Sequence, residues 1–211
     1  MEVDLPRDVA GEIRATARPG KAQEALERTD RAVSLLESGD AQGAAKEAER
    51  AKALAPRSAA VREILGLAFY AQERWRDAVR ELQAYRRMSG RLDENHVIAD
   101  SHRALGNPER AVQDAEQALD ADVPDEVKAE AAVVGASALT DMGRLDEALG
   151  FLRRFSAKAG QGRPFDLRVW YVSGDVLERL GRREDAAREF LKVLRYDPNA
   201  FDAAERLAAL T

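Results

Sequence analysis

Five alanines recur along this 211-residue chain at a nearly constant spacing. They are Ala44, Ala78, Ala111, Ala148 and Ala186, at intervals of 34, 33, 37 and 38 residues. Five residues before these alanines stand Gly39, Glu73, Gly106, Gly143 and Gly181. Glycine permits the tight turn in which one helix ends and the next begins. A period of this length therefore predicts an array of helix–turn–helix repeats.

Further residues at fixed offsets from these alanines support a family resemblance. The last repeat contains Trp170, Gly174, Ala186, Phe190 and Pro198, and the second contains Leu65, Gly66, Phe69, Ala78 and Leu82. With these residues the chain resembles the tetratricopeptide repeat (TPR) family over about five units. The resemblance implies an all-α fold, a right-handed superhelical solenoid closed by terminal capping helices.

We expect five repeats over residues 25–198, divided as 25–58, 59–91, 92–128, 129–166 and 167–198. Residues 1–24 precede them and contain a predicted helix over Leu5–Ala17, which is either a cap or an arm that exchanges onto another molecule. The abrupt start is also compatible with a piece of a longer protein. A long helix is expected over 21–37.

Residues 199–211 are expected to form a capping helix, which we predict over 200–210. Its apolar stripe is predicted to pack on repeat 5 and consists of Phe201, Ala204, Leu207 and Ala208. The polar residues Asp202, Glu205 and Arg206 are expected to face away from that repeat.

The resemblance also implies that the first helix of each repeat lines a concave groove. The groove residues that it selects as partner-binding are Glu63, Leu67, Tyr70, His96, Asp100, Arg103, Tyr171, Asp175 and Glu178. The last six form two triplets spaced i, i+4 and i+7, so each triplet shares one helix face. This pattern predicts a polar groove with aromatic anchors that binds a peptide or a helix of another protein. The alternative is a solvated face with ordinary i,i+4 pairs.

Charge is unevenly distributed along the sequence. Residues 91–147 contain 14 acidic and five basic residues, whereas the whole chain has a net charge of −5. An arginine-rich stretch precedes this region, and we expect its arginines to pair with acidic neighbours such as Glu73, Asp77 and Glu81. The sharper alternative is a dipolar surface that drives self-association into a homo-oligomer. An acidic chain is not expected to bind nucleic acid.

The sequence contains no recognisable catalytic or cofactor motif. There is no cysteine, and only His96 and His102 are histidines, so no metal-ligand set is apparent. We expect His96 at the surface and His102 half-buried in place of an aromatic ring. The segment 159–164 is rich in glycine but follows no predicted strand, so we interpret it as a connection between repeats. We therefore predict neither an enzyme nor a bound metal or cofactor.

Location is inferred from what the sequence lacks. No apolar run approaches the roughly 20 residues that a membrane-spanning helix needs. The first residues are charged throughout, unlike a signal peptide. We therefore expect a cytoplasmic protein without membrane contacts, and the richness in Ala, Arg and Gly suggests a bacterial one.

Overall fold

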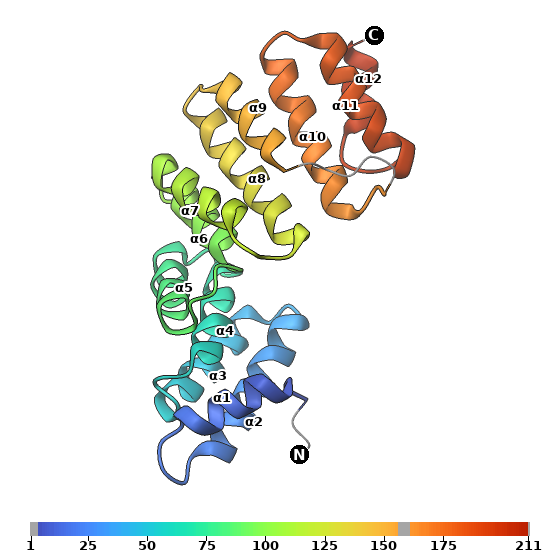
Figure 1. The fold of residues 1–211 in the computed structure, drawn as a ribbon. Helices are drawn as coiled ribbons and strands as arrows, with labels where there is room; N and C mark the ends of the chain where they lie inside the picture. The colour runs from blue at the N-terminus through green and yellow to red at the C-terminus, as the bar shows by residue number, and fades with distance from the viewer. Residues whose placement is uncertain (1–3, 156–160, 211) are drawn as a thin grey trace. The chain divides into compact units, whose positions relative to one another are not determined.

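The computed structural model describes residues 4–155 and 161–210, and within these ranges the chain is built from α-helices without a strand (Figure 1). In chain order the helices are α1 (Arg7–Thr16), α2 (Ala22–Glu37), α3 (Ala41–Leu54), α4 (Ala59–Tyr70), α5 (Trp75–Ser89), α6 (Asn95–Ala104), α7 (Pro108–Asp120), α8 (Asp125–Asp141), α9 (Leu145–Arg154), α10 (Pro164–Arg179), α11 (Arg183–Tyr196) and α12 (Ala203–Leu210). The predicted all-α helical repeat fold is confirmed.

The chain divides into two compact units. Unit 1 is Met1–Leu105 and contains α1 to α6, and unit 2 is Gly106–Thr211 and contains α7 to α12. The division falls within the third predicted repeat, between α6 and α7. The two units are described separately below.

The five turn positions selected from the sequence share one backbone conformation. Each lies in a connection of three or four residues between two helices. Their φ angles are 85° at Gly39, 57° at Glu73, 76° at Gly106, 74° at Gly143 and 72° at Gly181. The left-handed conformation reverses the chain at a helix end, and only glycine adopts it without steric cost. Among these five turn positions, Glu73 is therefore the one where a residue with a Cβ atom adopts the left-handed conformation.

Small side chains bring the helices of unit 1 close together. Ala44, Ala48 and Ala78 are fully buried, and they pack with Leu65 and Phe69 in one cluster of α2 to α5. In this cluster, alanines on one helix leave room for larger side chains on the next, which is why the sequence repeats alanine once per unit.

Helix α1 lies against the first repeat of its own chain. Its residues Ala10 and Ile13 are buried beside Leu26 of α2. The carboxylate of Glu12 accepts hydrogen bonds of 2.6 Å from the Ser58 hydroxyl and from the Ala59 backbone N–H. Because the first N–H groups of a helix have no partner within it, this carboxylate stabilises the start of α4.

In unit 2, aromatic side chains fill the space between paired helices. Phe190 of α11 is fully buried against Gly174 of α10, and Phe151 of α9 packs against Gly135 of α8. A Cβ atom at Gly135 would lie 2.3 Å from the Phe151 ring. Because the Phe151 ring occupies the space of a Cβ atom, only glycine fits at this position without a shift of the ring.

The C-terminal helix differs from its prediction. It begins at Ala203 rather than residue 200, and its only fully buried residue is Ala203. Of the predicted stripe, Phe201, Ala204 and Ala208 are exposed and Leu207 is partly buried. The predicted stripe was wrong because it was selected from apolar residues alone, whereas the side of α12 that packs inward also carries a charged residue. Arg206, which was expected to face away, instead contacts α10.

Two smaller expectations are also revised. His102 is buried, with 6% of its surface exposed, rather than half-buried, and His96 is half-buried rather than at the surface. The predicted connection 159–164 lies partly outside the described residues. Within its described part, Gly162 closely approaches the ring of Tyr196.

Candidate partner-binding surface

All nine predicted groove residues lie on first helices of the repeats, and all nine are partly exposed. Six of them belong to unit 1 and are here called the unit 1 face: Glu63, Leu67, Tyr70, His96, Asp100 and Arg103. The other three belong to α10 and are called the unit 2 face: Tyr171, Asp175 and Glu178. Partial exposure means that a partner can reach these side chains while the fold still restrains them.

In the unit 1 face, a hydrogen bond joins α4 to α6. The Tyr70 hydroxyl donates to the carboxylate of Asp100 at 2.7 Å, and Arg103 lies 3.5 Å from the other oxygen of that carboxylate. The Tyr70 ring packs edge-on against Trp75, with 5.3 Å between ring centroids. Because both ends of Tyr70 are held, its ring is fixed in place before any partner arrives.

The remaining residues of the unit 1 face are anchored at their inner sides. Leu67 packs against buried residues of α5 and α6, namely Leu82, Val97 and Ile98. The Nδ1 atom of His96 lies 2.9 Å from the backbone oxygen of Asp93. Since a carbonyl oxygen only accepts, this nitrogen carries the hydrogen.

Glu63 belongs to an acidic cluster that the sequence alone did not reveal. Burial, with the charge of Asp93, raises the pKa of Glu63 to about 7. Burial, with the charges of Glu63 and Asp93, also raises the pKa of Glu94 to about 7. Asp93 itself accepts a 2.8 Å hydrogen bond from the Tyr85 hydroxyl and pairs with Arg91. In the sequence, the adjacent acids Asp93 and Glu94 could have indicated an acidic cluster. Their proximity to Glu63 depends on helix packing and could not be read from the sequence.

In the unit 2 face, the three side chains converge on one arginine of α12. Arg206 donates to Asp175 at 2.8 Å and to Glu178 at 2.6 and 2.8 Å. The Tyr171 hydroxyl donates to Asp202 at 2.5 Å. Burial opposes the charge on the Arg206 guanidinium, but its hydrogen bonds to Asp175 and Glu178 outweigh that effect and raise its pKa. Sequence reasoning missed Arg206 because it was assigned to the outer side of the helix.

Two arginines of the arginine-rich stretch pair with two of the three acids named for it, Asp77 and Glu81. Arg74 lies 2.7 Å and Arg80 2.8 Å from the carboxylate of Asp77, and Arg80 also lies 3.1 Å from Glu81. Glu81 is buried and further pairs with Arg62 at 2.6 Å and with Lys52 at 3.1 Å. Burial opposes the charge of Glu81, but these hydrogen bonds keep its pKa below the usual range.

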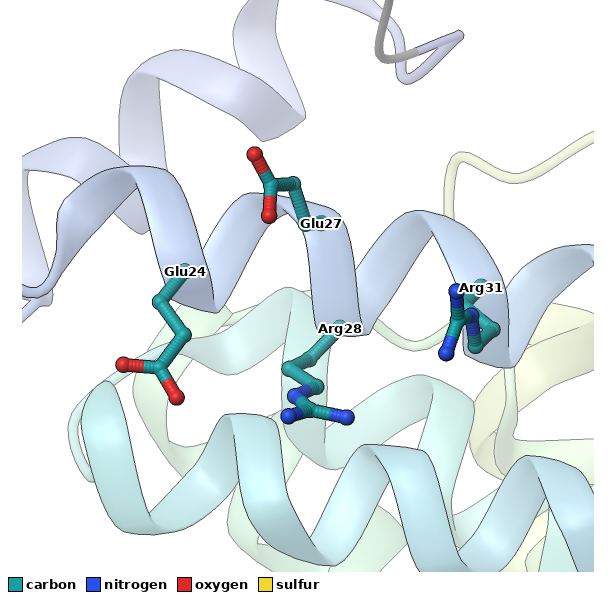
Figure 2. Close-up of a pocket in the computed structure, with 4 residues that line it drawn as sticks. All are labelled: Glu24, Glu27, Arg28 and Arg31. Atoms are coloured by element: carbon teal, nitrogen blue, oxygen red, sulfur yellow. The ribbon is translucent and has the colours of Figure 1, made fainter. Parts of the chain in front are cut away.

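Two small hollows lie elsewhere on the molecule. Figure 2 shows the first, of about 160 Å³, lined by the α2 side chains Glu24, Glu27, Arg28 and Arg31. Arg28 is turned toward α3, where it pairs with Glu47 at 2.9 Å. The second, of about 180 Å³, lies among α9, α10 and α11 and includes Asp185 paired with Arg182 and Arg188. Neither hollow includes a residue of the unit 1 or unit 2 face.

The described residues form neither a metal-binding cluster nor a membrane-spanning helix. Among them, no group of three or more His, Asp or Glu side chains is arranged to hold a metal ion. None of the helices in this part of the chain combines the length and the apolar character needed to cross a bilayer.

Comparison with solved structures identifies several repeat proteins of similar fold. YrrB, described as a TPR protein with an unusual peptide-binding site, is 19% identical with a TM-score of 0.61, covering 86% of this chain and 90% of YrrB. TTC0263, a thermophilic TPR protein of Thermus thermophilus, is 17% identical with a TM-score of 0.63, covering 88% and 98%. The quorum sensor NprR from B. thuringiensis is 15% identical with a TM-score of 0.72, covering 96% of this chain and 61% of NprR. At these identities the likeness concerns the fold.

No match was found among curated proteins. Two family models match the sequence itself, and both describe the tetratricopeptide repeat. One spans residues 29–91 and the other residues 95–199. Together they cover the region in which the alanine period, the left-handed turns and the glycine–aromatic contacts recur. The chain belongs to the tetratricopeptide repeat family.

Proposed function

We propose that this chain, with five repeats over residues 25–198, is a protein-interaction scaffold that binds a peptide or a helix of another protein on the first helices of its repeats. The observation that carries the proposal is the partial exposure of all nine groove residues, with tyrosines set among carboxylates. Tyrosine and arginine are enriched at protein interfaces because they combine apolar area with hydrogen bonding. Fixing Tyr70 through Asp100 lowers the entropy lost when a partner binds.

Family membership supports the same role. Tetratricopeptide repeat proteins generally mediate protein–protein interactions and are typically non-enzymatic scaffolds. YrrB is described as having a peptide-binding site, which supports a peptide or helix as the ligand class here. We propose an adaptor without catalysis or cofactor in a bacterial cytoplasm, and the richness in Ala, Arg and Gly favours the bacterial source.

A pull-down with three baits from a lysate of the source cells tests this function. One bait is the unchanged chain, and a second carries Tyr70→Ala, Asp100→Lys and Arg103→Glu in the unit 1 face. A matched control carries Glu49→Lys and Arg87→Glu, two exposed residues on the second helices α3 and α5. We expect a protein retained by the unchanged chain and the control but lost from the groove variant. Equal capture by all three would reject the unit 1 face as the interface.

Self-association is the alternative function, and an observation in unit 2 favours it. Leu191 and Phe201 are both 54% exposed, and Ala204 and Ala208 of α12 are exposed as well. Apolar side chains left open near one end of a repeat array resemble the contact that a further repeat would cover. A second molecule that covered them would form a homo-oligomer.

A further inference from the structure

We propose that the unit 2 face is a receptor for a partner helix that carries arginine, and that α12 is a displaceable internal occupant of this receptor. This inference rests on the proposed function and names the chemistry of the ligand at the unit 2 face. It follows from the contacts of Arg206, from the weak attachment of α12 and from the geometry of the residues around the guanidinium.

The unit 2 face provides a complete site for one guanidinium group. Two carboxylates accept from Arg206, Glu178 from both Nε and Nη2 and Asp175 from Nη2. The guanidinium carbon lies 5.2 Å from the ring centroid of Phe190 and 6.0 Å from that of Tyr171. Paired carboxylates with aromatic rings nearby match the planar, weakly hydrated guanidinium better than the compact ammonium of lysine. The site is therefore expected to prefer arginine over lysine.

Tyr171 defines a second part of the same site. Its hydroxyl donates to Asp202, and its ring lies 4.5 Å from that of Phe201. Asp202 immediately precedes α12, and its backbone oxygen accepts a 3.0 Å hydrogen bond from the Arg206 N–H, so the start of the helix presents both side chains to the unit 2 face. A fitting ligand is thus a helix that carries the arginine in its first turn, preceded by a turn with an aromatic residue followed by the acidic residue, four positions before the arginine.

The present occupant is only weakly attached. Helix α12 has eight residues, and Ala203 is the single one that is fully buried. The residue that leads into it, Phe201, has φ of 57°, a conformation disfavoured for a residue with a Cβ atom. A helix with little buried apolar area and a strained connection opens at low cost. Arg206 and Asp202 provide its side-chain hydrogen bonds to the unit 2 face, and an external helix with the same groups competes for these bonds.

A binding experiment with the full-length chain tests the proposal. The probe is a fluorescein-labelled peptide with the sequence of residues 198–210, measured by anisotropy. Binding to the unchanged chain is expected to be weak, because the tethered α12 has a high effective concentration. The variant Arg206→Ala should bind the peptide at least tenfold more tightly, because its own helix no longer competes well. The control Arg195→Ala, an exposed arginine of α11, should behave like the unchanged chain.

Changes in the receptor and in the probe then test the chemistry. Adding Asp175→Asn and Glu178→Gln to Arg206→Ala should abolish binding. A peptide with lysine in place of its arginine should bind more weakly, and one with alanine should not bind. Equal binding of the arginine and alanine peptides, or no gain in Arg206→Ala, would overturn the proposal.

A second measurement does not depend on any substitution in the chain. Hydrogen exchange of α12 in the unchanged protein should accelerate when the arginine peptide is added in excess, and not when the alanine peptide is added. Unchanged exchange with both peptides would reject displacement of α12. This result is separable from the pull-down, which alters only the unit 1 face: loss of the peptide effect with a positive pull-down rejects the arginine receptor alone.

Discussion

At the scale of single residues, Glu73 stands out because its backbone has the left-handed conformation that the other four turns give to glycine. Its side chain is exposed. A non-glycine residue in this conformation destabilises the folded state by about 1–2 kcal/mol. Glycine removes this strain, but the net gain is smaller because the unfolded chain becomes more flexible and loses more entropy on folding. We expect Glu73→Gly to stabilise the protein by about 0.5–1 kcal/mol, raising the melting temperature by a few degrees. A lower melting temperature would show that the Glu73 side chain makes a stabilising contact that outweighs the strain.

A second residue-scale prediction concerns Glu63 and Glu94, whose pKa values are raised to about 7. The usual glutamate pKa is near 4.3, so the folded state holds protons that the unfolded state has released between about pH 4.3 and 7. The stability of unit 1 should therefore fall as pH rises through this window. Thermal melting at pH 5.5 and pH 8 should show a higher melting temperature at the lower pH.

The variant Glu63→Gln provides the control for this pH effect. It removes one partly buried carboxylate and also one of the charges that raise the pKa of Glu94. We expect the variant to gain stability at pH 8 and to lose much of the difference between the two pH values. An unchanged difference would place the titrating groups elsewhere in the chain.

At the scale of helices, the alanine that defines the repeat period also sets the distance between paired helices. Ala78 of α5 is fully buried in the cluster that contains Leu65 and Phe69. Replacing it with leucine should overpack this contact and cost about 1–3 kcal/mol. The control is Ala53→Leu, at an exposed position of α3. If both variants melt like the unchanged protein, the register assigned to repeat 2 is wrong.

Two helical glycines allow a matched comparison of packing and propensity in unit 2. A Cβ atom at Gly150 of α9 would meet nothing within 4 Å, whereas one at Gly135 of α8 would lie 2.3 Å from the Phe151 ring. Gly150→Ala should therefore stabilise the protein by about 0.5–1 kcal/mol through helix propensity. Gly135→Ala should instead destabilise it, because Phe151 must move. Urea denaturation of both variants measures the two signs, and equal signs would contradict the close contact.

At the scale of the whole molecule, the prediction concerns self-association through the exposed apolar residues of unit 2. If a second chain covers Leu191, light scattering will show a mass that increases with protein concentration. Leu191→Glu should then hold the protein at the mass of one chain, because burying an unpaired carboxylate is unfavourable. A mass of one chain for the unchanged protein at all concentrations would remove this alternative.

The sequence by itself determined the class of fold, the repeat period, the turn positions and the helices that carry the nine groove residues. These properties are local, since a left-handed turn and an amphipathic helix depend on residues a few positions apart. Only the tertiary structure decided which charged groups meet. The acidic cluster of Glu63 and Glu94 and the position of Arg206 between Asp175 and Glu178 join residues from different helices. Such contacts depend on how the helices rotate and approach one another when they pack. For α12, the apolar pattern of the sequence alone predicted the wrong packed face.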